Sequence, residues 1–137
     1  EYVTSGSQEI GSRWPVYATS TGKAILAHLP PDELDAALPQ PMSPLTERTI
    51  TSSKHLREHL AEIRRRGYAV VVEELEMGFL AVGAPLLDPA GRPVAAISLG
   101  GTLTRMTDQR VPEIGELVRE AAARISHQLG FRKRLED

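Results

Sequence analysis

The chain has 137 residues, of which 41% are hydrophobic and 25% are charged, and it contains no cysteine. This composition is close to that of average soluble domains, so it excludes a disordered or fibrous chain, and the length predicts one hydrophobic core. The net charge of -2 argues against a broad nucleic-acid-binding face, and the lack of cysteine excludes disulfides and thiolate chemistry. No apolar run approaches the roughly 18–20 residues that span a bilayer, and no signal segment opens the chain. We therefore expect a cytosolic protein without membrane contact.

The first third of the chain predicts short elements separated by breaks. Residues 1–11 are polar, and Tyr2-Val3 is a strand-like pair, which indicates an edge strand or an ordered arm. Hydroxyl residues precede good helix formers in Thr19–Ala27, so a capped helix begins there with several unpaired N–H groups, which attract anions. Pro30 opens a second, short helix. Three prolines within residues 39–44 then break the chain.

A third helix and a sheet are predicted in the middle of the chain. Apolar residues recur at helical spacing in Lys54–Arg66 after a Ser52-Ser53 cap, and Gly67 is the natural end of that helix. Residues 66–101 then contain three apolar runs that predict the core sheet. Its strands are expected at Tyr68–Val72, Phe79–Leu87 and Val94–Leu99. A helical turn is expected after the first strand.

The turn between the first two strands is expected at Glu74–Met77, ending at Gly78. Gly100-Gly101 should end the third strand. The last long segment predicts an amphipathic helix that packs on the sheet. Its apolar face should consist of Val111, Ile114, Leu117, Val118, Ala121, Ile125 and Leu129.

Several motifs occur in a characteristic order along the chain. They are TSTGKAILA at 19–27, LTERTI at 45–50, IRRRGYA at 63–69, Glu-Glu-x-Glu-x-Gly at 73–78, GAPLLDPAGRPVAAISLGG at 83–101 and EAAARISHQLG at 120–130. Together they resemble the C-terminal effector-binding domain of the IclR family of bacterial transcription regulators. Within that family, Ser12–Pro15 and the acidic motif most resemble the regulators of aromatic-acid breakdown, the protocatechuate and β-ketoadipate group.

The resemblance implies an α+β fold with a GAF-like antiparallel sheet flanked by helices and a long C-terminal amphipathic helix. It implies an effector-binding domain over residues 1–137 that forms homodimers or homotetramers. It also implies an upstream winged helix-turn-helix domain, which residues 1–137 do not contain, so contact with DNA would occur only through that domain. No cofactor, metal or enzymatic activity is expected.

The resemblance also places an effector pocket on one helix and three strands. The implied pocket residues are Ser20, Thr21, Val71, Ala81, Ser98 and Gly100. The family often has Asp, Cys and Ser at the positions of Val71, Ala81 and Gly100, so this pocket should accept a more apolar ligand than glyoxylate or pyruvate. An aromatic or alkyl carboxylic acid is the expected effector.

Other residues around this pocket have both a functional and an ordinary interpretation. Ser20-Thr21-Gly22 can hold a carboxylate through N–H groups and hydroxyls, or it is simply a capped helix start. Arg13 can clamp the same carboxylate, or it is solvated or paired with a surface acid. Glu74 lies between two apolar strands, and if buried it needs Arg13 or a ligand hydroxyl as a partner.

Two further patterns have a chemical interpretation that we consider weaker. The acids Glu73, Glu74 and Glu76 are typical of acid–base sites, but no nucleophile accompanies them, and a solvent-facing strand end explains them equally well. His55 and His59 have the spacing of metal ligands on a helix, yet two ligands do not make a site, so an exposed pair is expected.

Three functions remain open from the sequence. The leading one is a regulatory domain that senses a carboxylate. The second is an oligomerisation module with a vestigial pocket, which gains weight from the apolar residues Val71, Ala81 and Gly100. An enzyme is the third, and neither a cysteine nor a Gly-rich phosphate loop supports it.

Overall fold

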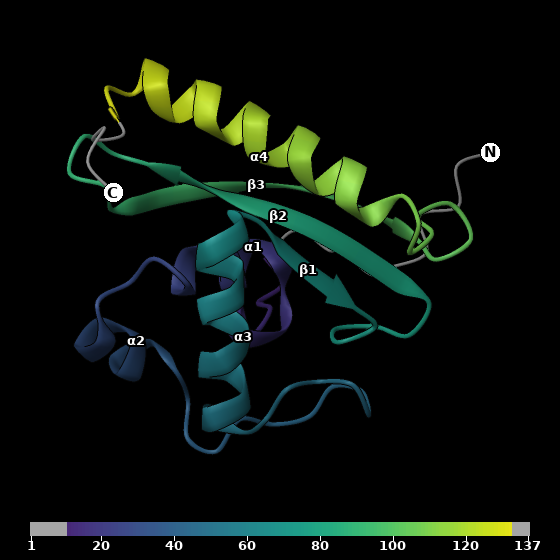
Figure 1. Ribbon diagram of the computed structural model, residues 1–137. Coiled ribbons are helices and arrows are strands. Elements are labelled where there is room, and N and C mark those ends of the chain that lie inside the picture. Colours follow the sequence, from purple (N-terminus) through teal and green to yellow (C-terminus); the bar gives the residue numbers. More distant parts are fainter. Residues whose placement is uncertain (1–10, 133–137) are drawn as a thin grey trace.

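A computed structural model describes residues 11–132 and shows a three-stranded antiparallel sheet between two layers of helices (Figure 1). The strands β1 (Ala69–Val72), β2 (Phe79–Leu87) and β3 (Pro93–Thr102) lie in the order β1-β2-β3. The long helix α4 (Val111–Gln128) crosses one face of the sheet. This arrangement confirms the α+β fold with a C-terminal helix on a flanked antiparallel sheet. None of the helices within residues 11–132 is long and apolar enough to cross a membrane.

The opposite face of the sheet carries the helices from the first half of the chain. They are the 3-10 turn η1 (Val16–Ala18) and the helices α1 (Ser20–Leu26), α2 (Pro31–Ala37) and α3 (Ser53–Arg66). Of these, α1 lies directly against β2 and β3, and α3 packs behind it. On this face, α1 is therefore the helix that packs on the middle of the sheet.

Local chemistry sets the ends of these helices as the sequence predicts. The side chain of Thr19 caps α1 by accepting a hydrogen bond from the Gly22 N–H at 3.1 Å. Ser52 caps α3 in the same way through the His55 N–H. Gly67 ends α3 in the left-handed conformation, with φ 89°, which a residue without a Cβ adopts at little cost.

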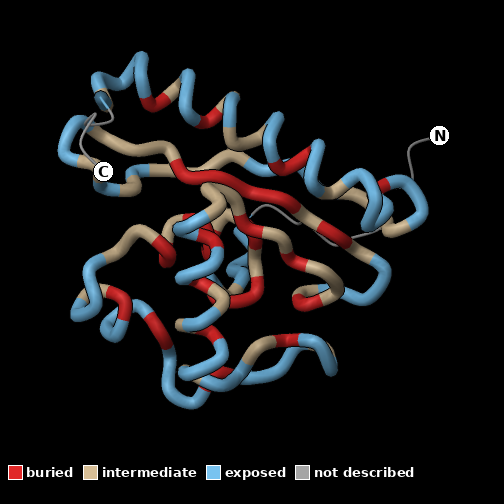
Figure 2. Tube along the Cα trace, viewed as in Figure 1, coloured by how far each residue is buried: buried red, intermediate tan, exposed pale blue. Residues whose placement is uncertain are grey.

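The alternation of side chains along β2 divides the core into two parts. Leu80 and Val82 point to α4, where they pack with Met106 and Ile114. The odd-numbered residues of β1 and β2 point to the other face of the sheet, toward α1 and α3. Ala69 joins the larger core on that face. Figure 2 shows the buried run along β2, which is covered on both faces.

Two of the sequence-based expectations for the loops and strands are corrected by the structure, and one is not tested by it. Residues 73–78 form bends and a turn instead of a helical turn, because Glu73 takes a left-handed φ of 55° and its N–H bonds to Phe79 O at 2.8 Å. The third strand does not stop at Gly100-Gly101, since both glycines pair with β2 and the strand continues to Thr102. The expected strand or arm at Tyr2-Val3 lies outside the described residues.

The apolar face of α4 also differs from the expectation. Ile114 is buried as expected, but Leu117 is 60% exposed and Leu129 is 49% exposed. Gly115 and Ser126 are buried instead. A Cβ on Gly115 would lie 2.4 Å from the Tyr68 ring, so the helix face that meets the sheet is the one that allows this close approach. Val111 and Val118 pack against the sheet core as expected, so periodicity misplaced one margin of the face rather than the whole of it.

The outer strand β3 is less covered than its neighbours. It contains no charged residue, and within residues 11–132 it pairs with a strand on one side only. Val94 and Leu99 are 57% and 51% exposed. Ser98 and Gly100 are exposed as well, so this part of the α1 face of β3 is open to solvent, whereas Ala96 packs against the larger core.

Candidate functional site

The start of α1 rests directly on the middle strand of the sheet. A Cβ on Gly83 would lie 2.8 Å from the backbone C and O of Ser20, a separation that only glycine permits. Gly83 pairs with Ser98 on β3, so Ser20 lies above the strand pair that holds Ser98. The structure thus brings together these two predicted pocket residues, which are 78 positions apart in the sequence.

The other predicted pocket residues form a row across the sheet. Val71 pairs with Ala81, and Ala81 pairs with Gly100, so each strand contributes one position to the row. Because side chains alternate between the two faces along a strand and paired residues share a face, all three lie on the α1 face. A Cβ on Gly100 would lie 3.5 Å from the Phe79 ring, which borders the row. The row is apolar from end to end.

The surface around this row is an open shelf rather than an enclosed cavity. Val71 is buried, Ala81 is partly buried and Gly100 is exposed. Among the hollows on the described residues, one lies over the outer side of α4 and one of about 230 Å³ lies between α1, α2 and α3. Neither is lined by a residue of the predicted effector pocket.

A buried ion pair lies between α1 and the turn at 73–78. Lys23 Nζ donates a hydrogen bond to Glu74 Oε1, and the side chains are 0% and 8% exposed. Burial lowers the pKa of Lys23 and raises the pKa of Glu74, while the charge of each partner acts in the opposite direction. The pair connects α1 to the turn that follows β1. Because both charges are desolvated, each depends on the other.

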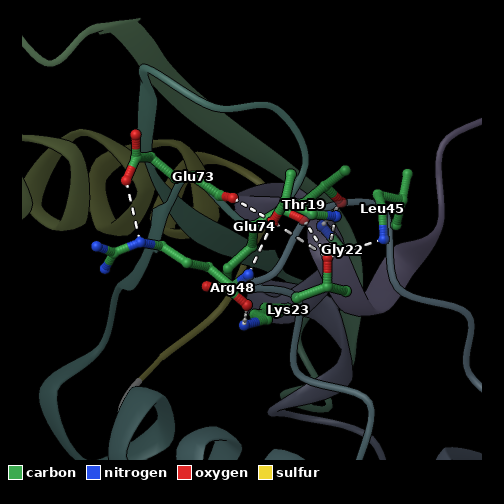
Figure 3. A network of polar contacts seen from close by, with 9 residues as sticks. Thr19, Gly22, Lys23, Leu45, Arg48, Glu73 and Glu74 are labelled. Carbon is green, nitrogen blue, oxygen red and sulfur yellow. Dashed lines mark hydrogen bonds and ion pairs between the residues drawn. The ribbon is translucent and has the colours of Figure 1, made fainter.

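The turn that carries Glu74 is held at several further points (Figure 3). Thr46 Oγ1 donates to Glu73 O at 2.6 Å, and Thr49 Oγ1 donates to Glu74 O at 2.7 Å. The Glu73 carboxylate accepts the Gly78 N–H at 2.8 Å and pairs with Arg48. These contacts stabilise the left-handed backbone at Glu73, which is unfavourable for a residue with a side chain.

Glu74 is buried as expected, but it does not pair with the expected partner Arg13. Arg13 is exposed, and Glu74 is paired with Lys23 instead. Sequence reasoning included Lys23 only as part of a motif. A signal was available, since a lysine one helical turn after Ser20 lies on the helix side that faces the sheet. Because the Thr19 side chain accepts the Gly22 N–H, fewer N–H groups are free at the start of α1 than expected.

The prediction that His55 and His59 are both exposed is wrong for His59. His55 is exposed, whereas His59 is only partly exposed and its Nε2 is buried without a hydrogen-bond partner among the described residues. Burial, with the positive charges of Lys23 and Arg66, lowers the pKa of His59 to about 4. No group of three metal-ligating side chains occurs within residues 11–132.

We expect His59 to make the protein less stable in mild acid. Because the folded pKa of about 4 lies below the unfolded value of 6.5, the unfolded state binds more protons between these values. Stability should therefore fall as the pH drops through this window, by at most about 1.4 kcal/mol per pH unit. His59→Leu should reduce this slope and leave stability at pH 7.5 unchanged or higher, as measured by urea unfolding at several pH values. His55→Leu is the exposed control, and an unchanged slope in His59→Leu contradicts the assignment.

The arrangement resembles that of known regulators. The model of the bacterial transcriptional regulator IclR C-terminal domain matches residues 1–127. The transcriptional repressor IclR of Escherichia coli K12 is 37% identical over 125 residues, which are 90% of this chain and 46% of that protein. The chain therefore spans about half the length of this relative. Its relatives are named as transcriptional regulators and repressors, not as enzymes.

Solved structures show the same fold. The Agobacterium tumefaciens repressor BlcR superposes with a TM-score of 0.84 and 34% identity, over 93% of this chain and 51% of that one. A double mutant of the inducer-binding domain of the Acinetobacter transcription factor PobR, in complex with 3-hydroxybenzoic acid, superposes with a TM-score of 0.77 and 29% identity. That match covers 86% of this chain and 69% of the PobR chain. The chain therefore belongs to the IclR family of bacterial transcriptional regulators, as a C-terminal regulatory domain.

Proposed function

We propose that this domain senses a small carboxylic acid with an apolar or aromatic body, bound between the start of α1 and the α1 face of the sheet. The observation that carries the proposal is the apolar row Val71–Ala81–Gly100, which lies beside Ser20 and Ser98. An apolar surface bordered by two hydroxyl groups suits a ligand whose polar atoms are all at one end. Thr21 and Gly22 adjoin this end at the start of α1.

The absence of polar side chains from the row determines the class of ligand. A short 2-oxo acid offers oxygen atoms along its whole length, and an apolar row would leave them without partners. An aromatic ring can instead cover Ala81 and Gly100 without loss of hydrogen bonds. The PobR inducer-binding domain, which shares this fold, was solved with 3-hydroxybenzoic acid. This supports an aromatic acid as the first ligand to test.

The regulatory consequence of binding is part of the same proposal. In a family of transcription regulators, a ligand acts by favouring one arrangement of the subunits over another. We infer that this domain forms homodimers or homotetramers and acts on DNA only through an upstream winged helix-turn-helix domain. Arg13 is exposed before η1 and is available to contact the ligand carboxylate when bound.

Substitution of Thr21 tests the site. Thr21→Glu places a negative charge where the ligand carboxylate should lie, so repulsion should abolish binding while the fold remains intact. Thermal shift and calorimetry should be measured with protocatechuate, 4-hydroxybenzoate, β-ketoadipate and short 2-oxo acids at millimolar concentration. Thr107→Glu, at an exposed position outside the site, is the matched control. Unchanged affinity in Thr21→Glu moves the site elsewhere, and no shift with any acid removes support for sensing.

A second candidate is an oligomerisation module without a ligand. The open shelf favours it, because Gly100 is exposed at one end of the apolar row and Ser20 fills the space above Gly83. Light scattering with and without the acids distinguishes the two functions. A stable oligomer that none of the acids binds or rearranges supports the module, whereas ligand-dependent rearrangement supports the sensor.

A further inference from the structure

The ion pair Lys23–Glu74 connects the two walls of the proposed site, which are the start of α1 and the strand β1. Lys23 follows Ser20 by three residues, so the two side chains share one side of α1. Glu74 follows Val71 by three residues and is the second residue of the irregular turn at 73–78 that follows β1. The pair thus joins α1, the helix wall, to the turn that follows β1, the strand wall. Within residues 11–132, it is the side-chain hydrogen bond that joins α1 to this turn.

Stability alone does not explain why two charges are buried at this point. Replacing a buried ion pair by apolar residues of similar volume is often neutral or stabilising, because the desolvation of both charges is then avoided. Apolar contacts are not directional, whereas a hydrogen-bonded ion pair fixes a distance and an angle between the elements that it joins. The left-handed backbone at Glu73 and the hydrogen bonds from Thr46 and Thr49 indicate that the position of this turn is closely specified.

We propose that Lys23 and Glu74 are positioning residues for the effector site, which set the separation between the start of α1 and the end of β1. The inference rests on the proposed sensing function, because it gives these residues a role in ligand binding without contact with the ligand. His59 lies near Lys23 and has no hydrogen-bond partner at Nε2 among the described residues, so it does not substitute for Glu74. The Lys23–Glu74 pair therefore defines the spacing of the walls.

A double substitution separates positioning from stability. Lys23→Met/Glu74→Leu removes both charges at similar volume, so the melting temperature should stay the same or rise. Affinity for the acid that binds the wild-type protein should nevertheless fall at least about tenfold, a loss of about 1.4 kcal/mol. The matched control is Arg65→Met/Glu62→Leu, which removes an exposed ion pair on α3 and should change neither quantity.

Hydrogen exchange provides a readout that does not require a ligand. In the Lys23→Met/Glu74→Leu protein, the amides at the start of α1 and along β1 should exchange at least about tenfold faster, while those of α4 stay protected. Unchanged exchange at both walls overturns the positioning role even if no acid binds, and so distinguishes its failure from failure of the sensing function. Wild-type affinity in the double variant overturns it as well.

A conservative variant keeps the test decisive if the double variant does not fold. Glu74→Asp retains the charge but shortens the carboxylate side chain by one methylene, so it keeps the ion pair only by moving the turn toward α1. We expect a folded protein with weaker ligand binding and faster exchange along β1. If Glu74→Asp matches the wild-type protein in both measurements, the spacing of the walls does not depend on this pair.

Discussion

Replacing Lys23 by Met is expected to lower the free energy of unfolding by about 3–5 kcal/mol, because it leaves a buried carboxylate without its cation. Glu74 is 6% exposed, so solvent compensates little for the lost charge. Urea unfolding at pH 7.5 measures the effect. Lys54→Met, which removes an exposed lysine at the start of α3, should change stability by less than about 0.5 kcal/mol.

The pH dependence of this deficit identifies its cause. Burial already raises the pKa of Glu74, and without Lys23 that pKa should rise further. Since the folded state then binds the proton more tightly than the unfolded state, the deficit is largest at neutral pH and shrinks as the pH falls through the raised pKa. A deficit that is equal at pH 7.5 and at pH 5 points to lost packing of the lysine stem rather than to an unpaired carboxylate.

Gly22→Ala is expected to destabilise the protein by about 1–3 kcal/mol or more, although alanine favours helices. The new Cβ would lie 2.2 Å from the Val16 carbonyl oxygen and 2.7 Å from the Val16 Cα. Both atoms belong to the backbone of η1, which the Tyr17 hydroxyl ties to Ser43 O at 2.8 Å. The clash therefore cannot be relieved by a side-chain rotation.

The control for this substitution is another glycine near the same site. A Cβ on Gly100 would meet its nearest atom, in the Phe79 ring, at 3.5 Å, which is an ordinary contact. Gly100→Ala should thus leave stability nearly unchanged in the same urea experiment. If Gly22→Ala is as stable as the wild-type protein, then α1 and η1 are able to separate, and the close packing at the start of α1 does not constrain the site.

Most elements of the fold could be predicted from local sequence. Thr19, Ser52 and Gly67 mark helix ends because capping and left-handed backbone depend on a few neighbouring residues. The bounds of β2 follow from one continuous apolar run. The turn at 73–78 was misjudged as helical, since its conformation is set by Thr46, Thr49 and Arg48, which precede it by more than twenty residues.

The candidate site was predicted from resemblance more than from the residues themselves. The positions of Val71, Ala81 and Gly100 in one row follow from the register of two strand pairs, which no single segment specifies. The orientation of α4 likewise depends on the contact between Gly115 and Tyr68, so periodicity placed Leu117 on the wrong side. The exposure of Gly100 at the end of the row could not be predicted, because it depends on what packs around β3.

The sequence by itself determined the family, the order of the elements and the apolar character of the proposed site, because these depend on residue identity and on short spacings. Only the tertiary structure decided how the charges within the core are paired. Lys23 and Glu74 are 51 residues apart, and the packing of α1 on the sheet brings them into contact. A buried charge takes whichever opposite charge the fold places within reach, and sequence distance carries no information about that choice.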